Sequence, residues 1–130
     1  MKNSEHMIPK IQMVKVDITD LKLRTIIGAN DWERNVCQDV VINIFLCYDA
    51  GKACTSDELK DAVDYKAMTK KVIRLVERSK FFLLEKLAAS VLDVIMAEKR
   101  VVEARVKIDK PFALRFASSV AVELAQKRPR

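Results

Sequence analysis

Four segments in which apolar and polar residues alternate are the feature that most restricts how this chain can fold. In each segment apolar side chains recur at every second residue, which is the period of a β-strand with one buried face. The turn sequence Gly28-Ala29-Asn30-Asp31 separates the first two segments, so we predict that they form a long hairpin, with a bend near Asp20. The four predicted strands are residues 11–27, 38–48, 102–109 and 119–124.

Between the two strand pairs, apolar residues recur at the spacing of an α-helix in residues 66–78 and 82–98. Residues 49–56 before them are predicted as a loop, and residues 56–63 as a short helix or turn. The second helix is apolar over so much of its circumference that it is either deeply buried or packed at a subunit interface. The element order ββααββ predicts the α+β class, with two helices on one face of an antiparallel four-stranded sheet.

The length of 130 residues suits one domain, and no repeat or linker divides the sequence. Half of the residues are apolar and 32% are charged, a balance that excludes a disordered chain. We predict a flexible N-terminus over residues 1–10, a single domain over residues 11–126 and a basic tail over residues 127–130.

The cysteines and the histidine argue against a metal centre. None of the three cysteines is part of a C-x-x-C pair, and the one histidine, His6, stands apart from them. A zinc site needs about four converging ligands, so we predict no metal, and the reduced thiols of a cytoplasmic protein are the simplest interpretation. The polar residues 1–10 lack the apolar core of a signal peptide, and the longest apolar stretch, residues 87–97, is too short to span a membrane.

A net charge of +6, from 24 basic and 18 acidic residues, is compatible with an anionic partner. Charges of both signs are interspersed, however, and no stripe of aromatic residues accompanies them, so solvated faces and a basic tail explain the excess better than nucleic acid does. We predict no nucleic-acid partner and no membrane partner, while a phosphorylated small molecule remains open. A basic α+β module that binds RNA or an acidic protein is the competing hypothesis, and it predicts an affinity that falls steeply with salt.

Four short motifs, in order and in register, resemble the dihydroneopterin aldolase family, to which the dihydroneopterin triphosphate 2'-epimerases are closely related. The resemblance extends over residues 14–124. It implies the tunnelling fold, in which a sheet and two helices assemble into rings, here a homo-octamer of two stacked tetramers with active sites between subunits. The motifs are Ile27-Gly28-Ala29-Asn30-Asp31-Trp32-Glu33 with Gln38 after it, Ala62-Val63-Asp64-Tyr65, Phe82-Leu83-Leu84-Glu85-Lys86-Leu87 and Ile108-Asp109-Lys110-Pro111.

Within the family the epimerase branch is the better match, although Asp31-Trp32-Glu33 is closer to the aldolases. Aldolases tend to carry glycine after the Lys-Pro pair, where this chain has Phe112. The resemblance therefore implies a 7,8-dihydroneopterin triphosphate 2'-epimerase with some aldolase activity. The alternatives are a dihydroneopterin aldolase of folate biosynthesis and a non-catalytic member of the fold that only binds a pterin. The epimerase-like segments are residues 21–25, 55–58, 83–87 and 110–117.

The resemblance also implies a retro-aldol reaction that requires neither a metal nor a cofactor. A base removes the proton of the 2'-hydroxyl, the C1'–C2' bond breaks, and the dihydropterin ring accepts the electron pair as an enamine. Protonation at C1' gives 6-hydroxymethyl-7,8-dihydropterin and glycolaldehyde. Re-addition to the opposite face of the aldehyde instead gives the epimer, in the dihydromonapterin series.

Three catalytic residues are implied by the same resemblance. Lys110 corresponds to the lysine that manages protons near N5 of the ring. Tyr65 corresponds to a tyrosine that is contributed across the subunit interface and relays a proton. Glu33 corresponds to a polar residue near the substrate side chain and its proton path.

The resemblance further implies a set of substrate-binding residues. Glu85 would anchor the pterin, because a carboxylate accepts two parallel hydrogen bonds from the 2-amino group and N3–H. Backbone groups of Val63 and Leu84 would complete recognition of the ring, and Gln38 would contact the substrate side chain.

A triphosphate substrate requires cations at the mouth of the site. Arg24 and Arg115 both lie in epimerase-like segments, which makes them the candidates. Both are hypotheses of the sequence alone, because 24 basic residues leave many other choices.

Overall fold

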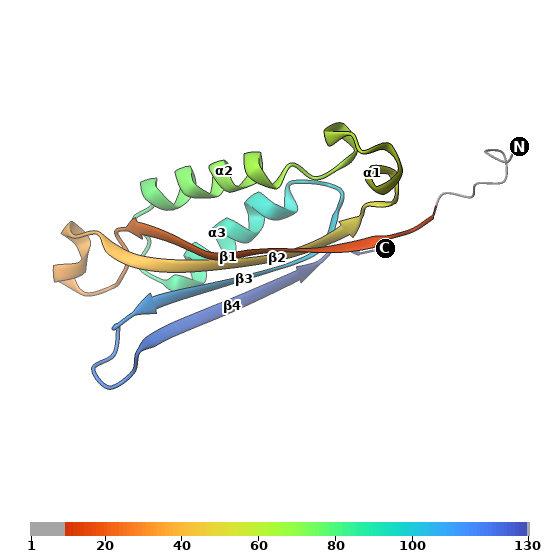
Figure 1. The fold of residues 1–130 in the computed structure, drawn as a ribbon. Helices are drawn as coiled ribbons and strands as arrows, with labels where there is room; N and C mark the ends of the chain where they lie inside the picture. The colour runs from red at the N-terminus through yellow and green to blue at the C-terminus, as the bar shows by residue number, and fades with distance from the viewer. Residues whose placement is uncertain (1–9, 130) are drawn as a thin grey trace, which may run out of the picture.

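The computed structural model describes residues 10–129, in which one antiparallel sheet is covered on one face by helices (Figure 1). The strands lie in the order β1-β2-β3-β4, and each pairs with its neighbour in that order. The predicted order of long elements, ββααββ, and the α+β class are confirmed. The strand bounds are Met13–Thr25 for β1, Gln38–Asp49 for β2, Val101–Pro111 for β3 and Ser119–Lys127 for β4.

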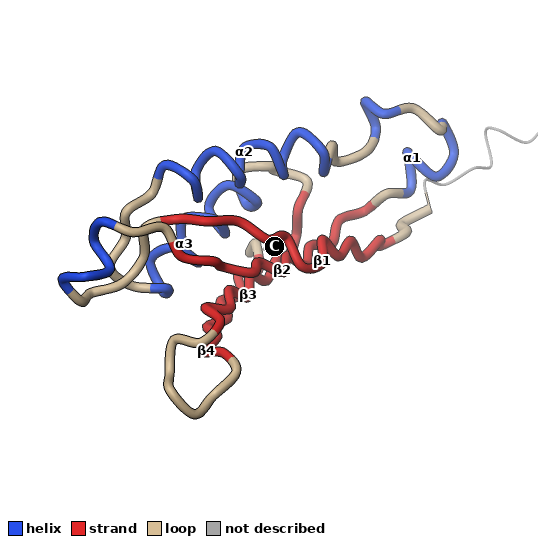
Figure 2. Tube along the Cα trace, turned by 60° about the vertical axis from the view of Figure 1, so that its left-hand side comes forward, coloured by secondary structure: helices blue, strands red, loops and turns tan. Residues whose placement is uncertain are grey.

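Two long helices, α2 (Tyr65–Arg78) and α3 (Leu84–Met96), lie across the same face of the sheet (Figure 1, Figure 2). Asp64 caps the first of them, because its side chain accepts a hydrogen bond from the Ala67 amide at 3.0 Å. Both helices direct an apolar stripe at the sheet. The buried helix residues are Met68, Val72 and Val76 of α2 and Leu87, Ala88, Val91, Leu92, Ile95 and Met96 of α3.

The strands supply the other half of the core by alternation. Side chains of β2 and β3 that point to the helices are buried, while their neighbours in the sequence point to the other face. The broad apolar surface of α3 is explained mostly within the chain, because six of its 13 residues are buried there. The buried strand residues include Val40, Ile42, Ile44 and Leu46 of β2 and Ala104, Val106 and Ile108 of β3.

The prediction of a loop over residues 49–56 is wrong for most of its length, because Gly51–Ser56 form a short helix, α1. This helix has no buried residue, so no apolar stripe in the sequence marks it. It ends at Asp57, which adopts the left-handed conformation with φ 58°. A 3-10 turn, η3 (Leu59–Asp61), follows, as the prediction of a short helix or turn over residues 56–63 allowed.

The bend expected near Asp20 is a β-bulge. The pairing of β1 with β2 shifts register between Ile18 and Leu21, and Asp20 has φ 55°. The Asn43 side chain accepts a hydrogen bond from the Asp20 amide at 2.9 Å and so holds the kink in place. The extra residue returns Leu21 and Leu23 to the helix-covered face, where both pack against the core.

The C-terminal end belongs to the packed structure. Lys127 is the last residue of β4. The Arg128 guanidinium donates to the carbonyls of Val101 and Met96 at 3.0 and 2.7 Å, and also to the Glu98 carbonyl at 3.3 Å. The first two residues of the predicted basic tail are therefore held against the end of α3 and the start of β3.

Residues 1–9 and Arg130 lie outside the described part of the chain. The predicted flexible N-terminus, residues 1–10, falls almost wholly there, as does His6. Among residues 10–129, no helix is long and apolar enough to cross a membrane.

Candidate active site

The turn between β1 and β2 folds a carboxylate back into the protein. Gly28 has φ 133°, which other residues rarely adopt, and a Cβ atom there would lie 2.1 Å from the Cδ atom of Glu33. A 3-10 helix, η2 (Asp31–Asn35), follows and carries Glu33 in its first turn. Glycine is therefore required at position 28 so that the Glu33 side chain can pass close to the backbone.

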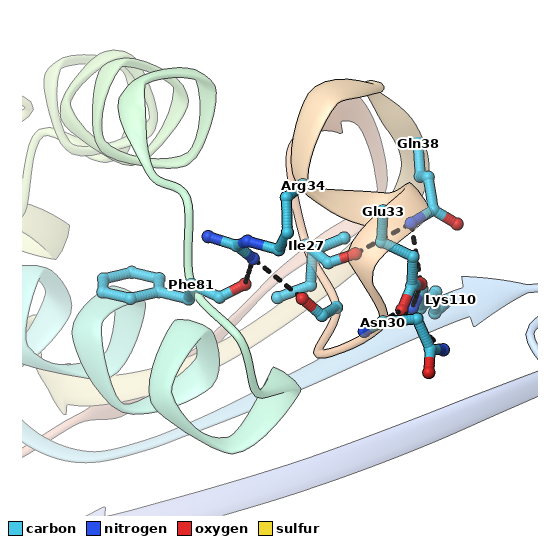
Figure 3. Close-up of polar contacts among 8 residues, drawn as sticks. Ile27, Asn30, Glu33, Arg34, Gln38, Phe81 and Lys110 are labelled. Atoms are coloured by element: carbon cyan, nitrogen blue, oxygen red, sulfur yellow. Dashed lines mark hydrogen bonds and ion pairs between the residues drawn. The ribbon is translucent and has the colours of Figure 1, made fainter.

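Glu33 is 3% exposed and is surrounded by hydrogen-bond donors (Figure 3). Its Oε1 accepts hydrogen bonds from the backbone and side-chain amides of Asn30 at 3.1 and 3.0 Å. Its Oε2 accepts from the Gln38 side chain at 2.9 Å and from the Lys110 ammonium at 2.5 Å. The structure thus brings together three of the predicted site residues, Glu33, Gln38 and Lys110.

These side chains come from distant parts of the sequence and meet at one end of the sheet. Lys110 is the next-to-last residue of β3, and its side chain is 12% exposed. Gln38 opens β2 and also donates from its Nε2 to the Ile27 carbonyl at 2.8 Å. The only polar partner that the described residues give the Lys110 ammonium is Glu33, so two of its three donors remain for a substrate.

The electrostatics of the site fix the charge of Glu33. Burial by itself would raise the pKa of this carboxyl, because removal from water disfavours the ionised form. The hydrogen bonds from Lys110, Gln38 and Asn30 and the positive charge of Lys110 outweigh burial and lower the pKa of Glu33 from about 4.5 to about 2. At neutral pH the Glu33 carboxyl is therefore ionised, and it holds the Lys110 side chain in one direction.

Arg34 joins this turn to the segment that leads into α3. Its Nη1 donates to the carbonyls of Gly28 and Phe81 at 2.8 and 3.1 Å, and its Nη2 donates to the Lys80 carbonyl. Its guanidinium also lies over the Phe82 ring, 3.9 Å from the ring centroid. Figure 3 shows Arg34 directed toward Phe81, away from the Glu33–Lys110 pair.

Asn30 and Arg34 are two residues of this site for which no role was predicted. The position of Asn30, three residues before Glu33 at the start of η2, is the spacing of a capping interaction and offered a signal. For Arg34 the sequence offered none, because its acceptors are backbone carbonyls, two of them 46 and 47 residues away.

The predicted ring-binding residues Leu84 and Glu85 open α3, a few residues after the Arg34 contacts. Glu85 is exposed and lies in the first turn of the helix, where the amides have no helical acceptors. Leu83, which precedes the helix, provides no side-chain cap. Within the described residues, the start of α3 therefore offers backbone donors beside a carboxylate.

Tyr65 opens α2, and Val63 precedes it by two residues. Figure 1 shows this end of α2 at the opposite end of the sheet from the end of β3. Val63 is buried and borders a hollow with Glu98 and Arg100, which immediately precede β3. Tyr65 is 58% exposed at the first turn of α2. Since Lys110 is near the far end of β3, the two ends are on the order of 30 Å apart along the strand.

The two arginines proposed for a triphosphate differ in their surroundings. Arg24 is exposed and donates to the Asp39 carboxylate and to the Cys37 carbonyl, both at 2.9 Å. It borders a hollow of about 380 Å³ together with Pro111 and Phe112. Arg115 lies in the exposed connection between β3 and β4, with its guanidinium 5.4 Å from the centroid of the Phe116 ring.

Metal ligands do not gather in the described part of the chain. Among residues 10–129, no group of three or more His, Cys, Asp or Glu side chains is placed to hold a metal ion. The cysteines Cys37, Cys47 and Cys54 are free thiols.

Comparison with known proteins agrees with the fold and with the family that the motifs resemble. The family model for dihydroneopterin aldolase (FolB) matches residues 16–125. A dihydroneopterin triphosphate 2'-epimerase of Escherichia coli K12 is 45% identical over 113 residues, which cover 87% of this chain and 94% of that protein. A dihydroneopterin aldolase of the same strain is 34% identical over 107 residues, which cover 82% of this chain and 88% of that protein.

A solved structure gives the same result in three dimensions. The atomic-resolution crystal structure of E. coli dihydroneopterin aldolase in complex with neopterin matches with a TM-score of 0.82 and 32% identity, covering 87% of this chain and 98% of that one. The tunnelling fold and the enzyme class expected from the sequence are thereby confirmed. Because the family model covers most of the sequence and the relatives match over nearly their whole length, this chain belongs to the dihydroneopterin aldolase family of pteridine aldolases and epimerases.

Proposed function

We propose that this protein is a 7,8-dihydroneopterin triphosphate 2'-epimerase that also cleaves dihydroneopterin slowly as an aldolase. The observation that carries the proposal is the shielded Glu33–Lys110 pair, with Oε2 and Nζ 2.5 Å apart, at the same end of the sheet as the carboxylate of Glu85. The higher identity to an epimerase, 45% against 34% for an aldolase, supports the choice between the two activities.

In the proposed reaction the pterin ring lies against the start of α3. The Glu85 carboxylate accepts hydrogen bonds from the 2-amino group and N3–H, and the Leu84 amide donates to the ring. This binding places N5 and C1' toward the Lys110 ammonium. The neopterin complex of the E. coli aldolase, a structural neighbour, supports a pterin as the ligand class.

The chemistry then needs a base at the 2'-hydroxyl and a proton donor at the ring. As the C1'–C2' bond breaks, the electron pair enters the C6–N5 system, and Lys110 supplies the proton at N5. Glu33 keeps Lys110 directed at that position and stabilises its charge, while Gln38 holds the other side of the carboxylate. Tyr65 relays the proton of the 2'-hydroxyl to solvent water. When C1' adds back to the opposite face of the aldehyde, Lys110 takes the proton back from N5 and Tyr65 relays a proton to the new 2'-oxygen, which completes epimerisation.

We further propose that two copies of the chain complete each site. Tyr65 and Lys110 lie on the order of 30 Å apart in one chain, so they can meet only across an interface. A ring assembly, in the form of two stacked tetramers, brings Val63 and Tyr65 of one copy to Lys110 and Glu85 of the next. A cytoplasmic location remains a prediction of the sequence.

The product assay tests the activity directly. Purified protein is incubated with 7,8-dihydroneopterin triphosphate and separately with 7,8-dihydroneopterin, and the products are resolved by chromatography. We expect the dihydromonapterin epimer as the main product, with 6-hydroxymethyl-7,8-dihydropterin and glycolaldehyde as minor products. Neither an epimer nor a cleavage product from either substrate would refute the proposed function.

Mixed assemblies test the shared site. A Lys110→Met variant and a Tyr65→Phe variant are each expected to be inactive, and co-refolding them should restore part of the activity. Restored activity requires sites that take Lys110 from one copy and Tyr65 from another. No restoration, in mixtures shown to contain both variants in one assembly, would contradict a site between subunits.

The triphosphate candidates are tested by comparing substrates. Arg115→Gln and Arg24→Gln should raise KM for the triphosphate and leave KM for unphosphorylated dihydroneopterin unchanged. Equal effects on both substrates would remove these arginines from phosphate binding.

A further inference from the structure

We propose that Arg34 is a positioning residue that sets the distance between the Glu33–Lys110 pair and the pterin-binding start of α3. The proposal rests on the proposed function, in which Lys110 handles protons and the start of α3 binds the ring. Arg34 follows Glu33 directly in η2, so one short turn carries both the group that orients Lys110 and the group that holds the approach to α3.

The segment that joins α2 to α3 depends on Arg34 for its hydrogen bonds. Residues 80–83 lie outside both helices. Within residues 10–129, the Lys80 carbonyl accepts only from Arg34, and the Phe81 carbonyl accepts from Arg34 and from the Gly28 amide at 3.2 Å. Without the guanidinium, the segment keeps one of these hydrogen bonds to the β1–β2 turn, the one from the Gly28 amide.

The Arg34 guanidinium also makes a cation–π contact with Phe82, in the same segment. The Phe82 ring is 60% exposed, and the Arg34 guanidinium lies over it at 3.9 Å. A planar guanidinium can donate to several carbonyls in its plane and stack on a ring with its face, which an ammonium cannot do. Lysine at position 34 would therefore keep the charge and lose the geometry.

Hydrogen bonds that do not involve Arg34 hold the end of α2, just before residues 80–83. Loss of Arg34 should therefore loosen residues 80–83 without unfolding the chain. The Thr25 hydroxyl donates to the Val76 carbonyl at 2.6 Å, and it lies 3.1 Å from the Ser79 carbonyl. These bonds fix the end of α2 to β1. The freedom released by removing Arg34 is thus confined to residues 80–83, which lead directly into Leu84 and Glu85.

Movement of residues 80–83 would affect catalysis, because the pterin ring bound at the start of α3 must lie at the correct distance from Lys110. A misplacement of about 1 Å from a remote change can lower the rate by roughly 100-fold. Glu33 would remain bonded to Lys110, Gln38 and Asn30, so the proton-handling group itself would stay intact. The defect would be a changed distance between the Glu33–Lys110 pair and the start of α3.

The test compares Arg34→Ala and Arg34→Lys with the wild-type protein by turnover and by calorimetry with neopterin, a pterin that is oxidised and not cleaved. We expect kcat to fall about 100-fold and the neopterin Kd to rise about 10-fold in Arg34→Ala. Arg34→Lys should recover little of either. Added guanidinium ion at millimolar concentration should restore part of the kcat of Arg34→Ala, since it can occupy the vacated position between the carbonyls.

Arg105→Ala is the matched control. Its guanidinium also lies over an aromatic ring, that of Phe45, 4.3 Å from the centroid, and it is exposed in the middle of β3, away from both ends of the sheet. We expect this variant to lose a guanidinium–ring contact, as Arg34→Ala does, while kcat and the neopterin Kd stay within about 2-fold of wild type. Equal losses of turnover in the two variants would show that Arg34 is only structural and overturn the proposal.

Further outcomes also decide the matter. If Arg34→Ala does not fold, Phe82→Ala, which removes the exposed ring and keeps the hydrogen bonds, should lower kcat several-fold without loss of fold. Unchanged kcat and neopterin Kd in a folded Arg34→Ala or in Phe82→Ala would overturn the proposal. A wild-type protein that binds neopterin without turning over either substrate would refute the proposed function alone, and the neopterin Kd of the variants would then decide the role of Arg34.

Discussion

Removing the positive charge from the Glu33–Lys110 pair should destabilise the protein in a way that depends on pH. Lys110→Met keeps a long unbranched side chain in the same space and leaves the buried Glu33 carboxylate without its counter-charge. The two side chains are only 12% and 4% exposed, with Nζ and Oε2 2.5 Å apart. Removing one partner of a buried pair costs about 3–5 kcal/mol. Asn30 and Gln38 still donate to Glu33, so we expect about 3 kcal/mol at pH 7.

The sign of the pH dependence follows from the pKa of Glu33, which is about 2 in the folded protein against an ordinary value of about 4.5. A depressed pKa contributes stability that is fully present above about pH 4.5 and is lost as the pH falls through about 2. In Lys110→Met the main cause of the lowering is gone, while burial still raises the pKa of Glu33. The difference between wild type and variant should therefore narrow from about 3 kcal/mol at pH 7 to about 1 kcal/mol at pH 3.

The assay is denaturant unfolding at one fixed protein concentration, because the stability of an assembly depends on concentration. A second variant completes the comparison: Glu33→Gln in the Lys110→Met background removes the unpaired charge and should recover about 2 kcal/mol at pH 7. A loss below about 1 kcal/mol in Lys110→Met, or a difference that is the same at pH 7 and pH 3, would refute the reasoning.

Three further substitutions probe the surroundings of the site. Gly28→Ala should cost at least about 2 kcal/mol in thermal unfolding and abolish turnover, because the new Cβ would lie 2.1 Å from Glu33; a stable, active variant would contradict this. Phe112 is 84% exposed and has φ 60°, a conformation that is strained for phenylalanine and not for glycine. Phe112→Gly should therefore stabilise the protein by about 0.5–1 kcal/mol in thermal unfolding, while Phe112→Ala should not. Thr25→Val removes the hydroxyl that donates to the Val76 carbonyl at 2.6 Å and should lower the free energy of unfolding by about 1 kcal/mol. An unchanged free energy of unfolding would show that this hydrogen bond does not stabilise the fold.

The fold could be predicted from the sequence because its long elements carry strong periodic signals. Alternation in β2 and β3 matches the buried and exposed positions along most of each strand, and Met68, Val72 and Val76 mark the inner side of α2. The short helix Gly51–Ser56 was missed for the opposite reason: none of its residues is buried, so no apolar pattern distinguishes it from a loop.

The site was predicted only in part, because its most important relation is between residues far apart in the sequence. Glu33 and Lys110 are separated by 77 positions, and nothing in the sequence shows that they form an ion pair. Glu33 was predicted by resemblance as a catalytic residue near the substrate side chain, whereas in the structure it accepts hydrogen bonds from Asn30, Gln38 and Lys110. Arg34 could not be predicted, because its acceptors are backbone carbonyls, which any residue type supplies.

Tyr65 and Lys110 lie at opposite ends of the sheet, and this affects how a mutant protein would act in a cell that carries a normal and a mutant gene. In the proposed ring, each copy contributes Tyr65 to one site and Lys110 to another, so a copy that is defective at both ends would inactivate two sites. A folded but doubly defective protein would then inactivate more sites in a mixed population than a mutant that fails to fold and stays out of the ring. Damage to the catalytic ends and damage to the core, at the fully buried Val72 of α2 or Val106 of β3, would thus act differently in such a cell, although both abolish the activity of the altered copy.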